Sequence, residues 1–242
     1  MNLGIIGAGH MAQAVGWLAV KAGHRVMASN SRGPRSLLGL REALGCEVGS
    51  ISEAAAFGDV VFAAIPLQAY RAIPAASLAG KVVLNPQNYF PHFGRIPELE
   101  NGELTTAELL ARHLPRSHVV KALNSILVED VVPDARPGGA ADRRALPIAG
   151  DNGEAKQAAI GFLNEIGYDA VDAGPLAEGW RFERRRPVYC VPLDKAMLAQ
   201  RRGCHDAGCG HAGRALALSD GHSWLTSSAM RRPRQWSKAI AQ

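Results

Sequence analysis

The first residues of the chain that could bind a ligand form a short glycine turn. Gly7, Ala8, Gly9, His10, Met11 and Ala12 follow an apolar run that starts at Leu3. Gly7 permits a tight turn, Gly9 lets backbone N–H groups approach a pyrophosphate, and Ala12 lets a helix pack closely on a sheet. The phosphates would lie at a helix N-terminus, where peptide dipoles favour negative charge. This pattern predicts a dinucleotide-binding turn; the alternative is a structural turn without a ligand.

A second group of candidate ligands follows the next predicted strand, residues 25–30. An NAD-specific site usually has an Asp or Glu there, which binds the ribose 2′-hydroxyl. This chain has Asn30, Ser31, Arg32 and Arg35 instead. No carboxylate in the turn would repel a 2′-phosphate, and guanidinium groups suit phosphate oxygens. The turn therefore favours NADP(H) over NAD(H), with a solvated basic turn as the alternative.

A parallel sheet would bring these turns together. Apolar runs at residues 59–66, 80–86, 118–124 and 146–150 alternate with helix-like segments, which predicts a doubly wound parallel α/β sheet of the Rossmann type. Ligands of such sheets lie outside the carboxyl ends of the strands. Three of these ends are Ile65-Pro66, the run Asn85-Pro86-Gln87-Asn88, and Asn124-Ser125. We expect them near the nicotinamide, although an asparagine can also bond only to its own loop.

The 242 residues suffice for one such domain and a small second unit. We place an NADP-binding domain at residues 1–175, a small C-terminal segment for a substrate or cofactor pocket at 176–194, and a basic tail at 195–242. The tail has eight lysines and arginines, two aspartates and little apolar periodicity, so we expect it to be disordered. Translation in a shifted frame is one alternative. A metal site is another, although its ligands, Cys204, His205, Cys209 and His211, lack the usual zinc spacing.

Composition argues against several classes of protein. Positive charge gathered in a tail, rather than along a folded face, argues against a nucleic-acid partner. No apolar run reaches the roughly 20 residues that cross a bilayer, and the N-terminus lacks a signal-peptide pattern, so we expect no membrane association. The four cysteines show no disulfide framework. These features predict a cytoplasmic protein.

Four stretches of the chain resemble the F420-dependent NADP oxidoreductase family: residues 4–12, 29–34, 119–125 and 167–176. The resemblance implies a Rossmann domain with a small C-terminal segment, which moves a hydride between NADPH and a deazaflavin (coenzyme F420) or a flavin. It implies a pyrophosphate beside the glycine turn, a 2′-phosphate beside Ser31, Arg32 and Arg35, and a nicotinamide near Ile65, Pro66 and Asn124. It also implies a homodimer. The sequence departs from the family after Leu193, which leaves the small-molecule hydride acceptor open.

Direct hydride transfer requires two rings held face to face, so positioning supplies the rate. We therefore assign no catalytic acid or base and no metal ligand, and we interpret His10 as a phosphate-side residue. Residues 179–190 offer arginines to an anionic cofactor tail and aromatics to a ring, or form a solvated turn that Trp180 and Phe182 anchor. Two other functions remain. One is a non-enzymatic NADPH sensor; the other is an imine reductase of the pyrroline-5-carboxylate reductase type, whose long helical C-terminal domain this tail does not supply.

Overall fold

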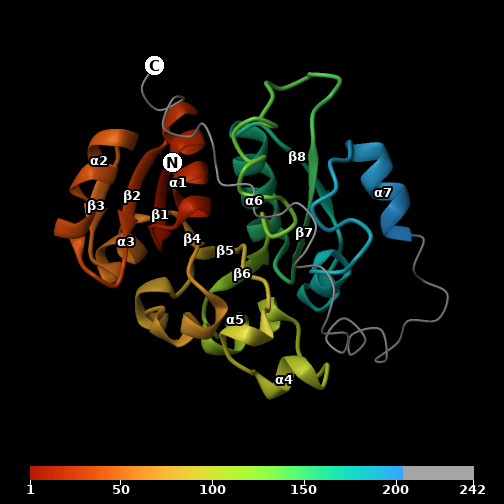
Figure 1. Ribbon diagram of the computed structural model, residues 1–242, viewed down its shortest axis with the longest axis horizontal. Coiled ribbons are helices and arrows are strands. Elements are labelled where there is room, and N and C mark those ends of the chain that lie inside the picture. Colours follow the sequence, from red (N-terminus) through yellow and green to blue (C-terminus); the bar gives the residue numbers. More distant parts are fainter. Residues whose placement is uncertain (204–242) are drawn as a thin grey trace.

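The computed structural model describes residues 1–203 of the chain, and their eight strands form one sheet (Figure 1). The strands are β1 (Asn2–Ile6), β2 (Arg25–Ser29), β3 (Glu47–Gly49), β4 (Val60–Ala63), β5 (Val82–Asn85), β6 (His118–Lys121), β7 (Ala145–Gly150) and β8 (Asp169–Asp172). Their order across the sheet is β3-β2-β1-β4-β5-β6-β7-β8. The predicted Rossmann-type architecture is confirmed.

The direction of the strands changes once. Strands β1 to β6 are parallel to their neighbours, whereas β7 pairs antiparallel with β6, with Lys121 opposite Ala149. Strand β8 is again parallel to β7. The carboxyl ends of the first six strands therefore meet at one edge of the sheet, and the last two strands present their amino ends there.

Helices cover both faces of the sheet. They are α1 (His10–Lys21), α2 (Leu38–Leu44), α3 (Ile51–Phe57), α4 (Pro97–Glu100), α5 (Thr106–His113), α6 (Gly153–Glu165) and α7 (Lys195–Gly203), with a 3-10 helix η5 at Leu176–Phe182. Helices α1, α2 and α6 pack on one face through buried alanines, leucines and Phe162. Helices α3 and α5 pack on the other. Figure 1 shows α1 beside β1 and α7 beyond β7 and β8.

Local sequence explains where several helices begin. Ser50 precedes α3, and its hydroxyl accepts from the N–H of Glu53 while the Glu53 carboxylate accepts from the N–H of Ser50. Thr105 and Glu108 make the same reciprocal pair before α5. Such capping boxes satisfy N–H groups that a helix itself leaves unpaired. The second box fixes α5 next to the carboxyl ends of β5 and β6.

The predicted disorder of the basic tail from residue 195 is wrong for its first part. Residues 195–203 form α7, whose Leu198 is 2% exposed and packs with Phe182. The helix begins after Asp194, whose carboxylate accepts from the N–H of Met197. Leu198 as the buried apolar side chain and Asp194 as the cap give almost no apolar periodicity, so the sequence did not indicate this helix. Residues 204–242, with the alternative cysteine and histidine metal site, lie outside the described residues.

No helix within residues 1–203 has both the length and the apolar character needed to span a bilayer.

Candidate functional site

The glycine turn joins β1 to α1, and its two glycines have different roles. Gly7 has a φ of 116°, donates its N–H to the Ser29 carbonyl at 2.9 Å, and leaves no room for a Cβ, which would lie 2.2 Å from the Ala64 carbonyl oxygen. The fold therefore requires glycine at position 7. Gly9 caps α1 with an ordinary φ of −73°, and a Cβ there would meet nothing within 4 Å.

The first turn of α1 leaves space for an anion. Within residues 1–203 no side chain caps the helix, no acidic residue lies in its first turn, and the space that a Cβ of Gly9 would occupy is open. His10 is exposed, Ala8 and Met11 are half-buried, and Ala12 is 2% exposed against the sheet. The helix N-terminus thus combines free N–H donors with a favourable dipole, as a phosphate site requires.

Asn30 organises the turn after β2. Its side-chain oxygen accepts from the N–H of Arg32 at 3.0 Å, and its amide nitrogen donates to the Ser36 hydroxyl at 2.9 Å. Ser31, Arg32 and Arg35 are exposed, and within residues 1–203 neither arginine forms an ion pair. The turn therefore presents two guanidinium groups next to the end of the strand that contacts Gly7.

Hydrogen bonds connect the carboxyl ends of β4, β5 and β6. Gln87 donates its side-chain amide to the Ile65 carbonyl at 3.0 Å, and its N–H to the Asn85 side chain at 2.8 Å. Asn88 donates to the Asn124 carbonyl at 2.8 Å. Pro66 is exposed after Ile65. The predicted strand-end residues Ile65, Asn85 and Asn124 thus lie along one continuous line of contacts that starts at Gly7.

Three buried polar atoms along this line have no partner within residues 1–203. They are Nδ2 of Asn85, Oε1 of Gln87 and Oδ1 of Asn124, whose residues are 0%, 4% and 2% exposed. Buried polar groups in native proteins are nearly always hydrogen-bonded. One donor and two acceptors match a carboxamide, which offers one carbonyl oxygen and an NH₂ group. In number and kind these groups match the amide end of a nicotinamide, and Gln87 belongs to one of the strand ends predicted to lie near it.

A buried ion pair fastens the C-terminal segment to this edge of the sheet. Lys121 ends β6 and is 0% exposed; its Nζ lies 2.6 Å from the Thr106 hydroxyl, 3.0 Å from the Glu183 carboxylate and 3.1 Å from the Gln87 carbonyl. Three acceptors match the three donors of an ammonium group. Burial lowers the pKa of Lys121, and Glu183 opposes that shift.

The same segment also reaches the strand-end asparagine. Asn124 donates its amide to the Phe182 carbonyl at 3.0 Å, next to Glu183. The sequence analysis missed Lys121, Thr106 and Glu183. A lysine within the apolar run from Val119 to Leu123 was the available signal, because an unpaired charge is costly in a buried strand.

An aromatic loop follows β5 beside the strand ends. The rings of His92 and Phe93 lie 4.2 Å apart, Phe90 lies 6.0 Å from Phe93, and the Arg184 guanidinium lies 4.5 Å from the Phe90 ring centroid. Phe93 is 67% exposed. Gln68 holds the loop by donating to the Phe90 carbonyl at 3.3 Å. Burial lowers the pKa of Arg184.

No group of three or more His, Cys, Asp or Glu side chains within residues 1–203 is placed to hold a metal ion.

A parallel sheet with a glycine turn after its first strand, and polar strand ends at one edge, defines the Rossmann class of nucleotide-binding proteins. Residues 2–89 match the family model described as NADP oxidoreductase, coenzyme F420-dependent. This match covers β1 to β5 and includes the glycine turn and the turn after β2. The resemblance predicted from the sequence is confirmed over these residues, and it supports an NADP-binding fold of an oxidoreductase family.

Relatives and solved structures extend the likeness beyond residue 89. Metalloreductase STEAP3 of Rattus norvegicus is 30% identical over 194 residues, which are 79% of this chain and 36% of that protein. A hypothetical protein of Sinorhizobium meliloti has a TM-score of 0.70 at 27% identity, over 81% of this chain and 95% of the other. A "putative F420 dependent NADP-reductase" of Arthrobacter has a TM-score of 0.62 at 22% identity, over 73% and 86%. This last likeness shows the fold alone.

The chain spans less than half the length of the curated relatives that it matches: 36% of the rat protein, and 45% and 26% of two bacterial proteins.

Proposed function

We propose that this protein is an NADPH-dependent oxidoreductase that transfers a hydride between NADP(H) and a planar acceptor, a deazaflavin (coenzyme F420) or a flavin. The three unpartnered buried atoms of Asn85, Gln87 and Asn124 are the observation that carries the proposal, because they complement a carboxamide at the strand ends. They lie on a line of contacts that begins at Gly7, as a nucleotide bound across the sheet edge requires.

Each part of the nucleotide then has a place. The pyrophosphate would bind the N–H groups from Gly9 to Met11 at the start of α1, where the dipole favours its charge. Arg32 and Arg35, with the Ser31 hydroxyl, would hold the 2′-phosphate in bidentate or charged hydrogen bonds. When bound, NADPH supplies the hydride from its nicotinamide ring. Ile65, Pro66 and the strand-end amides would orient that ring.

The acceptor would lie against the aromatic loop. Phe93 and His92 present exposed ring surface next to the end of β5, and Arg184 brings positive charge to the same loop. A planar acceptor with an anionic substituent matches both features, because aromatic rings stack and guanidinium groups bind anions. The Lys121–Glu183 pair and the hydrogen bond from Asn124 to the Phe182 carbonyl keep residues 182–184 in position.

We propose that the groups at the strand ends position the two rings and that none of them acts as a proton donor. Lys121 is enclosed by its three acceptors and does not reach the space beside Asn85 and Asn124. Rate enhancement would therefore come from holding two rings in contact. We propose residues 1–175 as the nucleotide-binding domain and extend the C-terminal segment from 176 through α7, because Leu198 packs with Phe182.

The test is a titration of the full chain with NADPH and with NADH, followed by acceptor addition. We expect NADPH to bind more tightly, and absorbance at the nicotinamide band to fall when coenzyme F420 or FMN is added. Cyclic imines and quinones complete the panel of acceptors. Oxidation by imines alone would identify an imine reductase. Binding without oxidation by any acceptor would identify an NADPH sensor, and equal affinity for both nucleotides would refute the 2′-phosphate assignment.

A further inference from the structure

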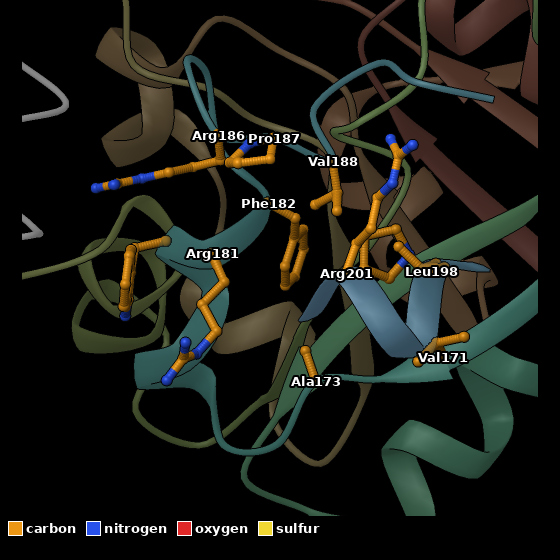
Figure 2. A pocket seen from close by; sticks show the side chains of 11 residues that line it. Val171, Ala173, Arg181, Phe182, Arg186, Pro187, Val188, Leu198 and Arg201 are labelled. Carbon is orange, nitrogen blue, oxygen red and sulfur yellow. The ribbon is translucent and has the colours of Figure 1, made fainter. Parts of the chain in front are cut away.

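A separate apolar pocket lies on the far side of Phe182. It occupies the space between β7 and β8 on one side and η5, the following loop and α7 on the other (Figure 2). Apolar side chains form most of its walls, among them Pro147, Val171, Ala173, Phe182, Val188 and Leu198. The space between them opens to solvent. The nucleotide site uses none of these side chains.

Positive charge surrounds this apolar centre. Arg181, Arg186 and Arg201 line the pocket, and Figure 2 shows their guanidinium ends around the outside while the rings and methyl groups lie between them. Trp180 also lines it, and the guanidinium groups of Arg181 and Arg186 lie 4.9 and 4.6 Å from its ring centroid. No acidic residue belongs to the lining, although Glu178 pairs with Arg181 at its edge.

The chemistry of this lining selects a ligand with two parts. Apolar walls favour a ring or a short hydrocarbon chain, because burial removes apolar surface from water. Arg201, on the α7 side of the pocket, adds positive charge that favours a carboxylate or a similar anion and disfavours a cation. A neutral apolar molecule would gain only the first contribution. An aromatic or short-chain carboxylate gains both.

We propose that this pocket is a second ligand site, distinct from the nucleotide crevice, which binds a small amphipathic anion of the aryl or short-chain carboxylate class. Phe182 separates the two sites. Its ring forms a wall of the pocket, and its carbonyl accepts the hydrogen bond from Asn124 in the crevice. A molecule can therefore occupy the pocket while a nucleotide occupies the crevice.

The test uses 1-anilinonaphthalene-8-sulfonate, an anionic fluorescent probe, on the full chain with NADP⁺ in excess. We expect the probe to bind in the presence of NADP⁺, 2-naphthoate to displace it, and neutral 2-naphthalenemethanol to displace it at least about fivefold less well. Displacement of the probe by NADP⁺ alone would overturn the proposal, because the probe would then occupy the crevice. If no NADP⁺ binds, the proposed function fails while the probe result still stands.

Two variants locate the probe. Arg201→Glu should weaken probe binding at least about fivefold, and Ala173→Leu should reduce it by filling the pocket. The matched control is Arg112→Glu, since Arg112 is also an arginine near the end of a short helix but lies on α5, away from the pocket. Unchanged binding in Arg201→Glu and in a folded Ala173→Leu would overturn the proposal. Binding that decreases as the protein dimerises would also overturn it, because the pocket would then be an interface between copies.

Discussion

Replacing Glu183 by glutamine would leave the Lys121 ammonium buried without its counter-charge. The Lys121 side chain is 0% exposed, whereas that of Glu183 is 19% exposed. The amide oxygen introduced by the substitution could still accept a hydrogen bond from the ammonium or from the Thr106 hydroxyl, which now donates to the carboxylate at 2.6 Å. The variant therefore loses charge compensation rather than all contact, and the free energy of unfolding should fall.

The size of the loss has an upper bound. A lysine can always escape an unfavourable site by releasing its proton, and from an ordinary pKa of about 10.4 this costs about 4.6 kcal/mol at pH 7. Removing one partner of a buried pair typically costs about 3–5 kcal/mol. We therefore expect Glu183→Gln to lower the free energy of unfolding by about 3–4.5 kcal/mol. Lys121→Met should cost less, about 2–3 kcal/mol, because the Glu183 carboxylate keeps its hydrogen bond from the Thr106 hydroxyl and its partial exposure to solvent.

The dependence on pH separates this explanation from a simple packing defect. Burial lowers the pKa of Lys121 in the folded protein, and without Glu183 nothing opposes that shift. Between the lowered folded pKa and about 10.4, the unfolded chain binds more protons, so the free energy of unfolding rises with pH. The loss in Glu183→Gln should consequently be smaller at about pH 9.5 than at pH 7.

Urea denaturation followed by circular dichroism at both pH values measures these differences. The double variant Lys121→Met/Glu183→Gln serves as the control, and its loss should be well below the sum of the two single losses. Charge compensation by Glu183 is ruled out if the free energy of unfolding of Glu183→Gln lies within about 1 kcal/mol of the wild-type value at pH 7. It is also ruled out if the difference between the two free energies does not change with pH.

Four further substitutions test the proposed nucleotide and acceptor sites. Arg32→Ala should weaken NADPH binding by about 1.5–3 kcal/mol in a fluorescence titration and leave NADH binding nearly unchanged, because the lost hydrogen bonds are charged. Equal weakening of both nucleotides would contradict the assignment of Arg32 to the 2′-phosphate. Gly9→Ala should keep the stability of the wild type and lose NADPH binding, whereas Gly7→Ala should lower the thermal midpoint, since its Cβ would meet the Ala64 carbonyl at 2.2 Å. Phe93→Ala should reduce kcat/KM for the acceptor about tenfold and leave the Kd of NADPH unchanged; a change in Kd alone would place Phe93 in the nucleotide site.

Periodicity and turn chemistry were enough to predict most of the sheet. The predicted segments place six of the eight strands, because each buried strand reads as a short apolar segment between turns. Strand β8 was not among them, and two of its four residues are aspartates. Strand β3 escaped prediction, since its three residues, Glu47 to Gly49, contain a single large apolar side chain. The reversal at β7 also escaped prediction, because a buried strand has the same apolar pattern in either direction.

Some residues of the candidate site could be predicted from the sequence and others could not. Local signals indicated the glycine turn and the basic turn after β2, because each lies within a few consecutive residues. The contacts of Asn124 with Asn88 and Phe182, and those of Lys121 with Glu183, join segments far apart in the chain. No spacing rule links such residues. The packing of η5 against β6 and α5 brings them together.

The two outer strands bear on how copies of this chain can associate. Within residues 1–203, β3 and β8 each have one neighbouring strand, so each leaves a row of backbone groups unpaired. Both are short, with three and four residues, and both carry acidic side chains: Glu47 on β3, and Asp169 and Asp172 on β8. Short charged edges resist the addition of a further strand. Self-association of this fold would therefore use its helical faces, and continuous sheets across two copies are disfavoured.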